Sequence, residues 1–127
     1  MIVGSGIDII DVERMRKTIS RWGDRLLRRL FTDKEIDYSK KRMDSAQHLA
    51  ARFCAKEALI KATGGGWEKG MRWTDVEILN DKNGKPEVRI YGPARRLLSK
   101  ARVSKVMVSM SHTRDYAVAS AILEGKG

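Results

Sequence analysis

Two acidic side chains and a lysine are the residues of this sequence best suited to metal and phosphate chemistry. Asp8 lies inside an apolar, β-branched segment, and Glu57 and Lys61 lie one turn apart in a segment with helical periodicity. An ionised carboxylate in an apolar strand is costly unless it is paired or bound to a metal ion. Mg²⁺ accepts one or two protein carboxylates and takes its other oxygens from water and substrate phosphates. The three residues therefore suit a magnesium site for a phosphorylated ligand.

Each of these residues also has a structural interpretation. Glu57 and Lys61 can form an i,i+4 ion pair on a solvated helix face, worth about 0.3–0.5 kcal/mol. Asp8 can cap a loop at the end of its strand. His112 can donate to a phosphate near a metal, although a lone histidine is more often structural. The residue types alone leave these alternatives open.

Length and charge set the background for such a site. The chain has 127 residues, which fits one domain spanning residues 1–127, and its net charge of +10 suits an acidic partner. Cys54 is its only cysteine, and we expect it to be a small buried thiol. No apolar run reaches the roughly 20 residues that span a bilayer, and the first residues lack the pattern of a signal peptide. We therefore expect a cytoplasmic protein.

The residue counts and motifs of the sequence exclude several common kinds of binding site. One cysteine and two histidines cannot supply the usual ligands of a structural zinc ion. Neither the phosphate-binding pattern G-x-x-x-x-G-K-[ST] nor the dinucleotide pattern G-x-G-x-x-G is present. Gly64-Gly65-Gly66 can bring the backbone close to a phosphate, but a plain helix stop explains it equally well.

Hydrophobic periodicity and turn signals predict the elements that position these residues. We expect a buried strand over 2–10, helices over 11–23, 24–30, 32–42, 45–63 and 93–102, strands over 74–79 and 87–91, and a hairpin of 105–111 with 116–123. The expected N-caps are Asp11, Thr32 (in a capping box with Glu35) and, for the central helix, either Asp44 or Ser45. Helices and antiparallel hairpins in this order predict the α+β class, with an antiparallel sheet packed around a long central helix.

The central helix over 45–63 has several distinct faces on a helical wheel. One apolar stripe consists of Leu49, Phe53 and Ile60, and a stripe of methyl groups consists of Ala51, Ala55, Ala58 and Ala62. A second element can approach the methyl stripe closely. Between the stripes lie Glu57 and Lys61. We expect Arg52 and Lys56 on the opposite, wetter side, and His48 on the surface.

Three motifs occur together in this short chain. They are Gly6-Ile7-Asp8, the segment Phe53-Cys54-Ala55-Lys56-Glu57-Ala58-Leu59-Ile60-Lys61-Ala62, and Ser109-Met110-Ser111-His112. In type, order and spacing they resemble the G-x-D, [FW]-x-x-K-E-A-x-x-K-A and S-x-S-H motifs of the holo-acyl-carrier-protein synthase family of 4'-phosphopantetheinyl transferases. The resemblance covers nearly the whole chain. It implies that family's fold and the transfer of 4'-phosphopantetheine from coenzyme A to a serine of apo-acyl carrier protein, releasing 3',5'-ADP.

The resemblance also implies roles for individual residues. Asp8 and Glu57 would ligate Mg²⁺, Lys61 would neutralise a phosphate oxygen, and either Glu57 or a metal-bound water would accept the serine proton. The other residues implied in coenzyme A binding are Arg52 at the 3'-phosphate, Gly64 after the central helix, Asn83, Lys85 and Pro86 near the adenine, and Ser109, His112 and Thr113 at the nucleotide phosphates. One departure is Gly64-Gly65-Gly66, where members often carry Gly-Thr-Gly, so a hydroxyl is missing.

Partners follow from the same resemblance. An acidic carrier protein would dock on Arg14, Arg21 and Arg25, in a stretch where seven basic residues between 14 and 29 are opposed only by Asp24. The family works as a homotrimer with sites shared between subunits. We expect service to fatty acid biosynthesis, although carriers of polyketide or peptide synthesis are not separated by sequence. Neither nucleic acid nor membrane is an expected partner.

The main alternative from another class is a basic nucleic-acid-binding domain. The net charge of +10 and the arginine-rich helices favour it. No recognition-module signature is present, however, and only 6% of the residues are aromatic, which leaves few stacking platforms. It also gives no reason for Asp8 and Glu57.

Overall fold

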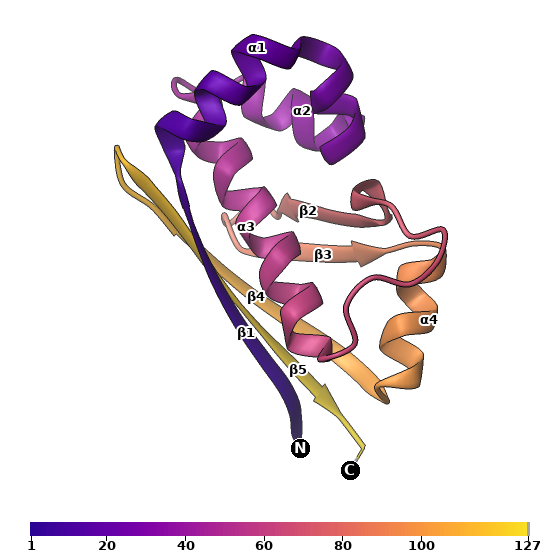
Figure 1. Cartoon of the computed structure of the whole chain (residues 1–127). Coiled ribbons are helices and arrows are strands. Elements are labelled where there is room, and N and C mark those ends of the chain that lie inside the picture. The colour runs from indigo at the N-terminus through magenta and orange to yellow at the C-terminus, as the bar shows by residue number, and fades with distance from the viewer. Residues whose placement is uncertain (127) are drawn as a thin grey trace.

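The computed structural model describes residues 1–126 and has a long helix crossing one face of a three-stranded sheet (Figure 1). The helices are α1 (Val12–Leu30), α2 (Asp33–Lys40), α3 (Ser45–Thr63) and α4 (Pro93–Lys100), with a short 3-10 helix at Trp73–Asp75. The strands are β1 (Ile2–Asp11), β2 (Val76–Asn80), β3 (Pro86–Ile90), β4 (Val103–His112) and β5 (Tyr116–Gly125). The expected α+β class is confirmed. Residue 127, the end of the expected single domain, lies outside the described residues.

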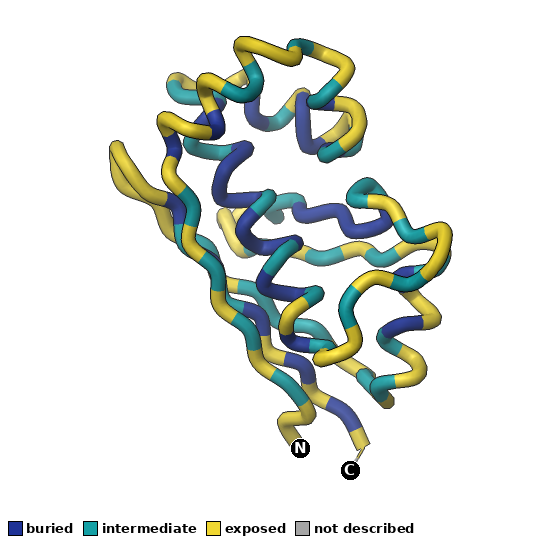
Figure 2. The backbone as a smooth tube through the Cα atoms, in the orientation of Figure 1, coloured by how far each residue is buried: buried dark blue, intermediate teal, exposed yellow. Residues whose placement is uncertain are grey.

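The three-stranded sheet has the order β1-β5-β4 and is antiparallel, so β1 and β4 form its two edges. The expectation of a buried strand over 2–10 is wrong. Ile7 and Ile9 on β1 are 65% and 64% exposed, because alternate residues of the strand face away from α3 on the uncovered face of the sheet. Figure 2 shows exposed and half-buried positions alternating along β1. The other two strands, β2 and β3, form a separate antiparallel pair.

Close contact between β1 and α3 depends on two glycines. A Cβ atom at Gly4 would lie 2.1 Å from the backbone oxygen of Ala62, and one at Gly6 would lie 2.1 Å from that of Ala58. Any side chain at these positions would therefore force the strand away from the helix. The predicted close approach to the methyl stripe is confirmed, and it brings the next inward-facing residue of β1, Asp8, onto α3.

Local signals predicted the helix ends well. The Asp11 carboxylate accepts a hydrogen bond from the Arg14 backbone N–H at 3.1 Å, and the Thr32–Glu35 capping box forms. Gly23, with φ of 66°, kinks α1, and Gly64, with φ of 71°, ends α3 in the left-handed conformation. The strand expected from residue 74 begins instead at Val76, because the preceding residues form the 3-10 helix.

The expected wet side of α3 is buried, so that prediction is wrong. Arg52 is 1% exposed and Lys56 is 0% exposed. Lys56 Nζ donates to the Leu30 and Trp73 backbone oxygens at 2.8 and 3.1 Å and to Glu35 at 2.8 Å. A helix packed on several sides buries long charged side chains when they are fully hydrogen-bonded, and a helical wheel cannot distinguish such a face from a solvated one. No helix within residues 1–126 is long and apolar enough to cross a membrane.

Candidate active site

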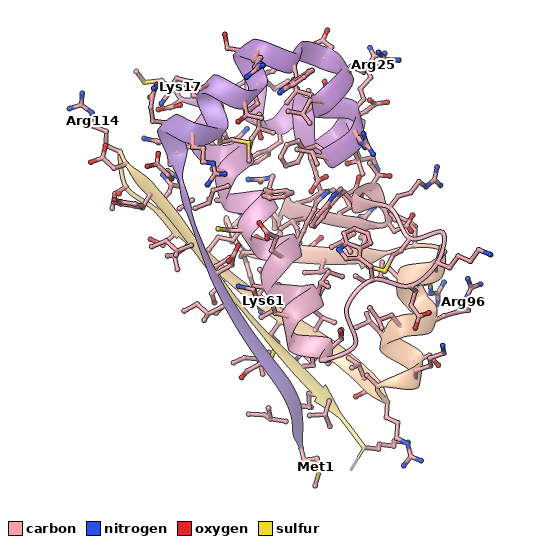
Figure 3. The ribbon with its side chains drawn as sticks, viewed as in Figure 1. Met1, Lys17, Arg25, Lys61, Arg96 and Arg114 are labelled. Atoms are coloured by element: carbon pink, nitrogen blue, oxygen red, sulfur yellow. The ribbon has the colours of Figure 1, made fainter. Side chains whose placement is uncertain are left out.

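The side chains of Asp8 and Lys61 meet between β1 and α3. Lys61 Nζ donates to Asp8 Oδ1 at 2.9 Å and to the backbone oxygen of Ile7 at 3.4 Å. Figure 3 shows Lys61 on α3 beside β1. The Lys61 side chain is 56% exposed and that of Asp8 only 15% exposed. The carboxylate is thus held between strand and helix, while the ammonium remains accessible to a ligand.

Glu57 adds a second carboxyl group one turn from Lys61. Burial, followed by the negative charge of Asp8, raises the pKa of Glu57 from 4.5 to about 7, although Lys61 partly opposes the shift. The hydrogen bond to Asp8 raises the pKa of Lys61. Two carboxyl groups beside one ammonium leave an excess of negative charge that a divalent cation would neutralise. We call Asp8, Glu57 and Lys61 the carboxylate half-site.

The donor set of the carboxylate half-site fits magnesium better than a transition metal. Within residues 1–126 no three His, Cys, Asp or Glu side chains are arranged so that they could together hold a metal ion. A cation held by Asp8 and Glu57 would therefore take most of its ligands from water and from a bound molecule. Mg²⁺ binds in that manner, and it prefers oxygen ligands.

Cys54 lies on α3 behind the carboxylate half-site and is fully buried. Its thiol is directed at the Ala117 backbone oxygen at 3.4 Å. Burial raises the pKa of Cys54 to about 12, so the thiol stays neutral and unreactive. The expected structural role of Cys54 is confirmed.

A cleft of about 370 Å³ opens beside Asp8 and Glu57, between β1, α1 and α3. Its apolar lining is formed by Ile9, Ile10, Met15, Leu26, Leu30 and Phe53. Arg14, an expected docking residue, and Thr18 line the same cleft from α1. The other two expected docking residues, Arg21 and Arg25, are exposed on α1. A ligand bound at the carboxylates would therefore lie directly beneath the basic helix.

A second group of the expected site residues lies at the other edge of the sheet. His112 ends β4, and its ring packs edge-to-face on that of His48, with centroids 5.1 Å apart. His48 was expected on the surface but is half-buried, and burial, followed by the charge of His112, lowers its pKa. Ser109 and Thr113 are exposed, and Thr113 Oγ1 accepts the backbone N–H groups of Asp115 and Tyr116 in the hairpin turn.

Arg52 belongs to this second group rather than to the carboxylates. Its guanidinium lies 4.2 Å from the Tyr38 ring, and that of Arg42 lies 3.3 Å from the same ring. Arg52 Nη2 donates to Asn80 Oδ1, whereas its buried Nε has no partner within the described chain. We call Tyr38, Arg42, His48, Arg52 and His112 the basic half-site. Tyr38 and Arg42 were not predicted from the sequence: Tyr38 lies on α2, Arg42 follows the end of that helix, and only the packing of α2 on α3 brings them to Arg52.

The turn between β2 and β3 is connected to the basic half-site. Asn80 Nδ2 donates to the Gly84 backbone oxygen at 2.9 Å, so the residue that holds Arg52 also holds this turn. Asn83 and Lys85 are exposed, Pro86 opens β3, and the Asp81 carboxylate accepts the backbone N–H groups of Asn83 and Lys85 at 2.8 and 2.9 Å. The expected adenine contacts therefore lie beside the expected 3'-phosphate contact.

One chain does not bring the two half-sites together. Asp8 pairs with Ala119 and His112 pairs with Ala117, which places both residues on neighbours of β5 but on opposite sides of it. Gly64, the remaining expected contact, caps α3 beyond Lys61. At the next residue, Gly65, a Cβ would lie 3.2 Å from a Leu97 methyl group, so a threonine there would require that methyl group to move by a few tenths of an ångström.

Comparisons with known proteins agree in sequence and in fold. A family model described as the 4'-phosphopantetheinyl transferase superfamily matches residues 4–121. A curated protein from Geobacter metallireducens, named holo-[acyl-carrier-protein] synthase, is 47% identical over 124 residues, 98% of each chain. Solved holo-[acyl-carrier-protein] synthases from Neisseria meningitidis and Bacillus anthracis are each 34% identical, with TM-scores of 0.85 and 0.80. The first covers 98% of this chain and 99% of its own, the second 99% of both, and the second is described in complex with CoA (3',5'-ADP).

Proposed function

The chain belongs to the 4'-phosphopantetheinyl transferase superfamily, as an enzyme of the holo-acyl-carrier-protein synthase type, and from that premise we propose how its residues perform the transfer. The reaction moves the 4'-phosphopantetheine arm of coenzyme A to a serine of apo-acyl carrier protein and gives holo-acyl carrier protein and 3',5'-ADP. The observation that carries the assignment is the carboxylate half-site, where Asp8, Glu57 and Lys61 occupy the positions of the family's motifs. Asp8 and Glu57 line one cleft, and Lys61 is hydrogen-bonded to Asp8.

Asp8 and Glu57 are proposed to hold Mg²⁺, which would neutralise charge on the coenzyme A phosphates. Lys61 supports the same reaction, because its exposed ammonium can turn from Asp8 to a phosphate oxygen on which charge grows. We propose Glu57 as the group that accepts the serine proton, because its carboxylate lies in the cleft beside Asp8. Phe53 and Leu30 help to exclude water from the cleft.

The nucleotide end of coenzyme A is proposed to bind the basic half-site. The positive charge of the buried Arg52 would attract the 3'-phosphate, with His112 and Thr113 near the other phosphates and Ser109 on the same strand as His112. Asn83, Lys85 and Pro86 would contact the adenine, and the backbone at Gly64 would approach the phosphates from the carboxylate side. These residues supply donors and positive charge, which phosphates require.

A homotrimer with shared sites is proposed because the half-sites lie at opposite edges of one sheet. The β1 edge of one subunit would meet the β4 edge of the next. The exposed apolar residues on the outer face of the sheet support such an interface: Ile7, Ile9, Tyr116 and Ile122, which are 65%, 64%, 53% and 36% exposed. Contiguous apolar surface of this kind is typical of protein–protein contacts.

The carrier protein is proposed to dock on α1 through Arg14, Arg21 and Arg25. Trp22, 60% exposed, lies 5.2 Å from the Arg21 guanidinium and would add an apolar contact. An acidic carrier would then present its serine over the cleft that Arg14 lines. We propose the carrier of fatty acid biosynthesis as the main substrate, in the cytoplasm. Comparing kcat/KM for fatty-acid and polyketide carriers tests that preference.

The decisive experiment is to weigh an apo-acyl carrier protein by mass spectrometry after incubation with the enzyme, coenzyme A and Mg²⁺. We expect a gain of one phosphopantetheine arm, and no gain with EDTA. Asp8→Ala and Glu57→Ala should abolish the gain, whereas Glu87→Ala, an exposed acid on β3, should not. No gain across several carriers and metals would contradict the proposal. Steeply salt-dependent binding of DNA or RNA would then favour the nucleic-acid alternative.

A further inference from the structure

A second cavity lies beyond the catalytic cleft, and the proposed reaction does not use it. Its volume is about 470 Å³, within the range of small-molecule sites. It lies between the C-terminal half of α1 and the segment that joins α3 to β2. Its apolar lining consists of Trp67, Met71 and Trp73, and its charged lining of Arg28, Arg29 and Arg72.

Helix α1 forms one wall of both cavities. Leu26 and Leu30 line the catalytic cleft, whereas Arg28 and Arg29, on the same two turns, line the second cavity. The kink at Gly23 changes the direction of α1 before these residues, so that its C-terminal half passes over the core. Helix α1 is therefore a wall that the two cavities share.

An aromatic series forms the opposite wall. The Phe53 ring lines the catalytic cleft beside Glu57 and lies 4.8 Å from the Trp73 ring. The Trp73 ring lies in turn 4.4 Å from that of Trp67, and both tryptophans line the second cavity. These packed rings therefore form one aromatic wall that extends from the carboxylate half-site to the second cavity.

Positive charge in the second cavity comes mainly from Arg29 and Arg72, because Arg28 also lines a hollow with Asp24, Asp33 and Asp37. No ion pair joins Arg28 or Arg29 to a carboxylate within residues 1–126. Arg72 has only a long contact, 3.9 Å, to Asp75, and its side chain is 77% exposed. The neighbouring acid, Glu68, is engaged by Lys100 at 3.2 Å. Aromatic walls with unpaired guanidinium groups suit an apolar chain that ends in an anion.

We propose that the second cavity receives the acyl group of an acyl-coenzyme A donor and favours acyl groups that end in a carboxylate. The inference rests on the proposed function, because it needs the pantetheine arm to leave the carboxylate half-site along Phe53. The acyl chain packs on Trp67 and Trp73, and its terminal carboxylate pairs with Arg29 and Arg72.

The chemistry of the transfer is unchanged with such a donor. The carrier serine oxygen forms a bond to the β-phosphorus, and the bond from that phosphorus to the oxygen bridging to the α-phosphorus breaks. 3',5'-ADP leaves, the serine proton passes to the base, and the thioester is carried over intact. The product is a carrier that already bears its acyl group.

The test compares glutaryl-coenzyme A with valeryl-coenzyme A, which has a methyl group in place of the carboxylate. With saturating carrier protein, we expect kcat/KM to favour the glutaryl donor by about fivefold, as an exposed ion pair allows. Arg72→Gln and, separately, Arg29→Gln should bring the ratio close to one. Trp67→Ala should lower kcat/KM for both acyl donors relative to coenzyme A. Arg95→Gln, an exposed arginine on α4 outside the cavity, should keep the ratio of the parent enzyme.

Each other result has a definite meaning. A ratio of one in the parent enzyme, or an unchanged ratio in both arginine variants, overturns the inference while activity with coenzyme A upholds the proposed function. Absence of transfer from coenzyme A itself overturns the proposed function instead. If Arg29→Gln raises the KM of the carrier and leaves the donor ratio intact, Arg29 contacts the carrier and the acyl assignment is wrong.

Discussion

Lys56 and Glu35 form an ion pair of 2.8 Å in which neither side chain is exposed. Glu35 also accepts the backbone N–H groups of Thr32 and Ile78, at 2.8 and 2.9 Å, so its two oxygens serve α2, α3 and β2 together. Burial lowers the pKa of Lys56, and Glu35 opposes the shift. Lys56 precedes Glu57 in the chain, so the pair anchors the part of α3 that carries the carboxylate half-site.

Replacing Lys56 with Ala should destabilise the fold strongly. The change leaves the Glu35 carboxylate buried without its partner, which typically costs about 3–5 kcal/mol. Urea denaturation at pH 7, with Lys34→Ala as the exposed control on α2, measures the difference. The control should stay within about 0.5 kcal/mol of the parent. A loss in Lys56→Ala no larger than in Lys34→Ala would show that the pair does not stabilise the fold.

Only part of the surroundings of the Lys56–Glu35 pair could be predicted from the sequence. The capping box of Thr32 and Glu35 was predictable because it is local, three residues wide. Lys56, the partner of Glu35 on α3, was not predictable, because the position of a buried lysine on a helical wheel does not differ from that of an exposed one. The exposure of Ile7 and Ile9 was likewise hidden, since an uncovered sheet face has the composition of a covered one.

The carboxylate half-site was accessible from sequence only through motifs. The spacing of Glu57 and Lys61 on one helix follows from the helical repeat, but their contact with β1 depends on how closely a strand can approach. The basic half-site required the packing of α2 on α3, so Tyr38 and Arg42 carried no sequence signal strong enough to join Arg52.

Gly6→Ala should damage both stability and activity. Its Cβ would lie 2.1 Å from the Ala58 backbone oxygen, so β1 must move from α3 and take Asp8 with it. We expect a loss of about 1–3 kcal/mol in the free energy of unfolding, as for overpacked cores, and a fall in kcat of at least about tenfold. Ser5→Ala, an exposed neighbour on β1, is the control. Normal kcat in Gly6→Ala would show that the close approach does not position Asp8.

Glu57→Gln should change how stability depends on pH in the absence of Mg²⁺. The folded protein raises the pKa of Glu57 from 4.5 to about 7, so folding favours the protonated carboxyl group. At pH 4 the Glu57 carboxyl group is largely protonated in both the folded and the unfolded state, so it has little effect on stability. As the pH rises toward 8, the ionised group destabilises the fold, by at most about 1–2 kcal/mol because solvent screens its charge.

Thermal melts with EDTA at pH 5 and pH 8 measure this effect. The Tm of Glu57→Gln relative to the parent should be higher at pH 8 than at pH 5. Glu87→Gln, on the exposed side of β3, should show the same difference from the parent at both values. If the Tm depends on pH in the same way in Glu57→Gln and in the parent, the pKa of Glu57 is not raised in the folded protein.

Reversing two charges on α1 should mainly raise the KM of the carrier protein. The double variant Arg14→Glu, Arg21→Glu is expected to raise the KM of the carrier protein by at least about tenfold, because it opposes an acidic partner, and to change that of coenzyme A far less. Arg95→Glu with Arg96→Glu on α4 makes the same change of charge elsewhere on the surface. Equal changes in KM for both substrates, or equal changes in the two double variants, would contradict the docking assignment.

Shared sites can be detected by mixing inactive variants. Asp8→Ala removes the carboxylate half-site of a subunit, and His112→Ala weakens its basic half-site. If each site joins the β1 edge of one subunit to the β4 edge of the next, a hybrid trimer contains sites in which both halves are intact. Random reassembly of equal amounts should restore about a quarter of the parental sites.

The control mixture combines Asp8→Ala with Glu57→Ala, both in the carboxylate half-site, and should stay inactive. Subunits are exchanged by denaturation and refolding, and activity is followed by release of 3',5'-ADP. Recovery only in the Asp8→Ala and His112→Ala mixture requires that the two half-sites come from different chains. No recovery, with hybrids verified by native mass spectrometry, would mean that each site forms within one chain, and β1 and β4 would then have to approach each other by a rearrangement of the sheet.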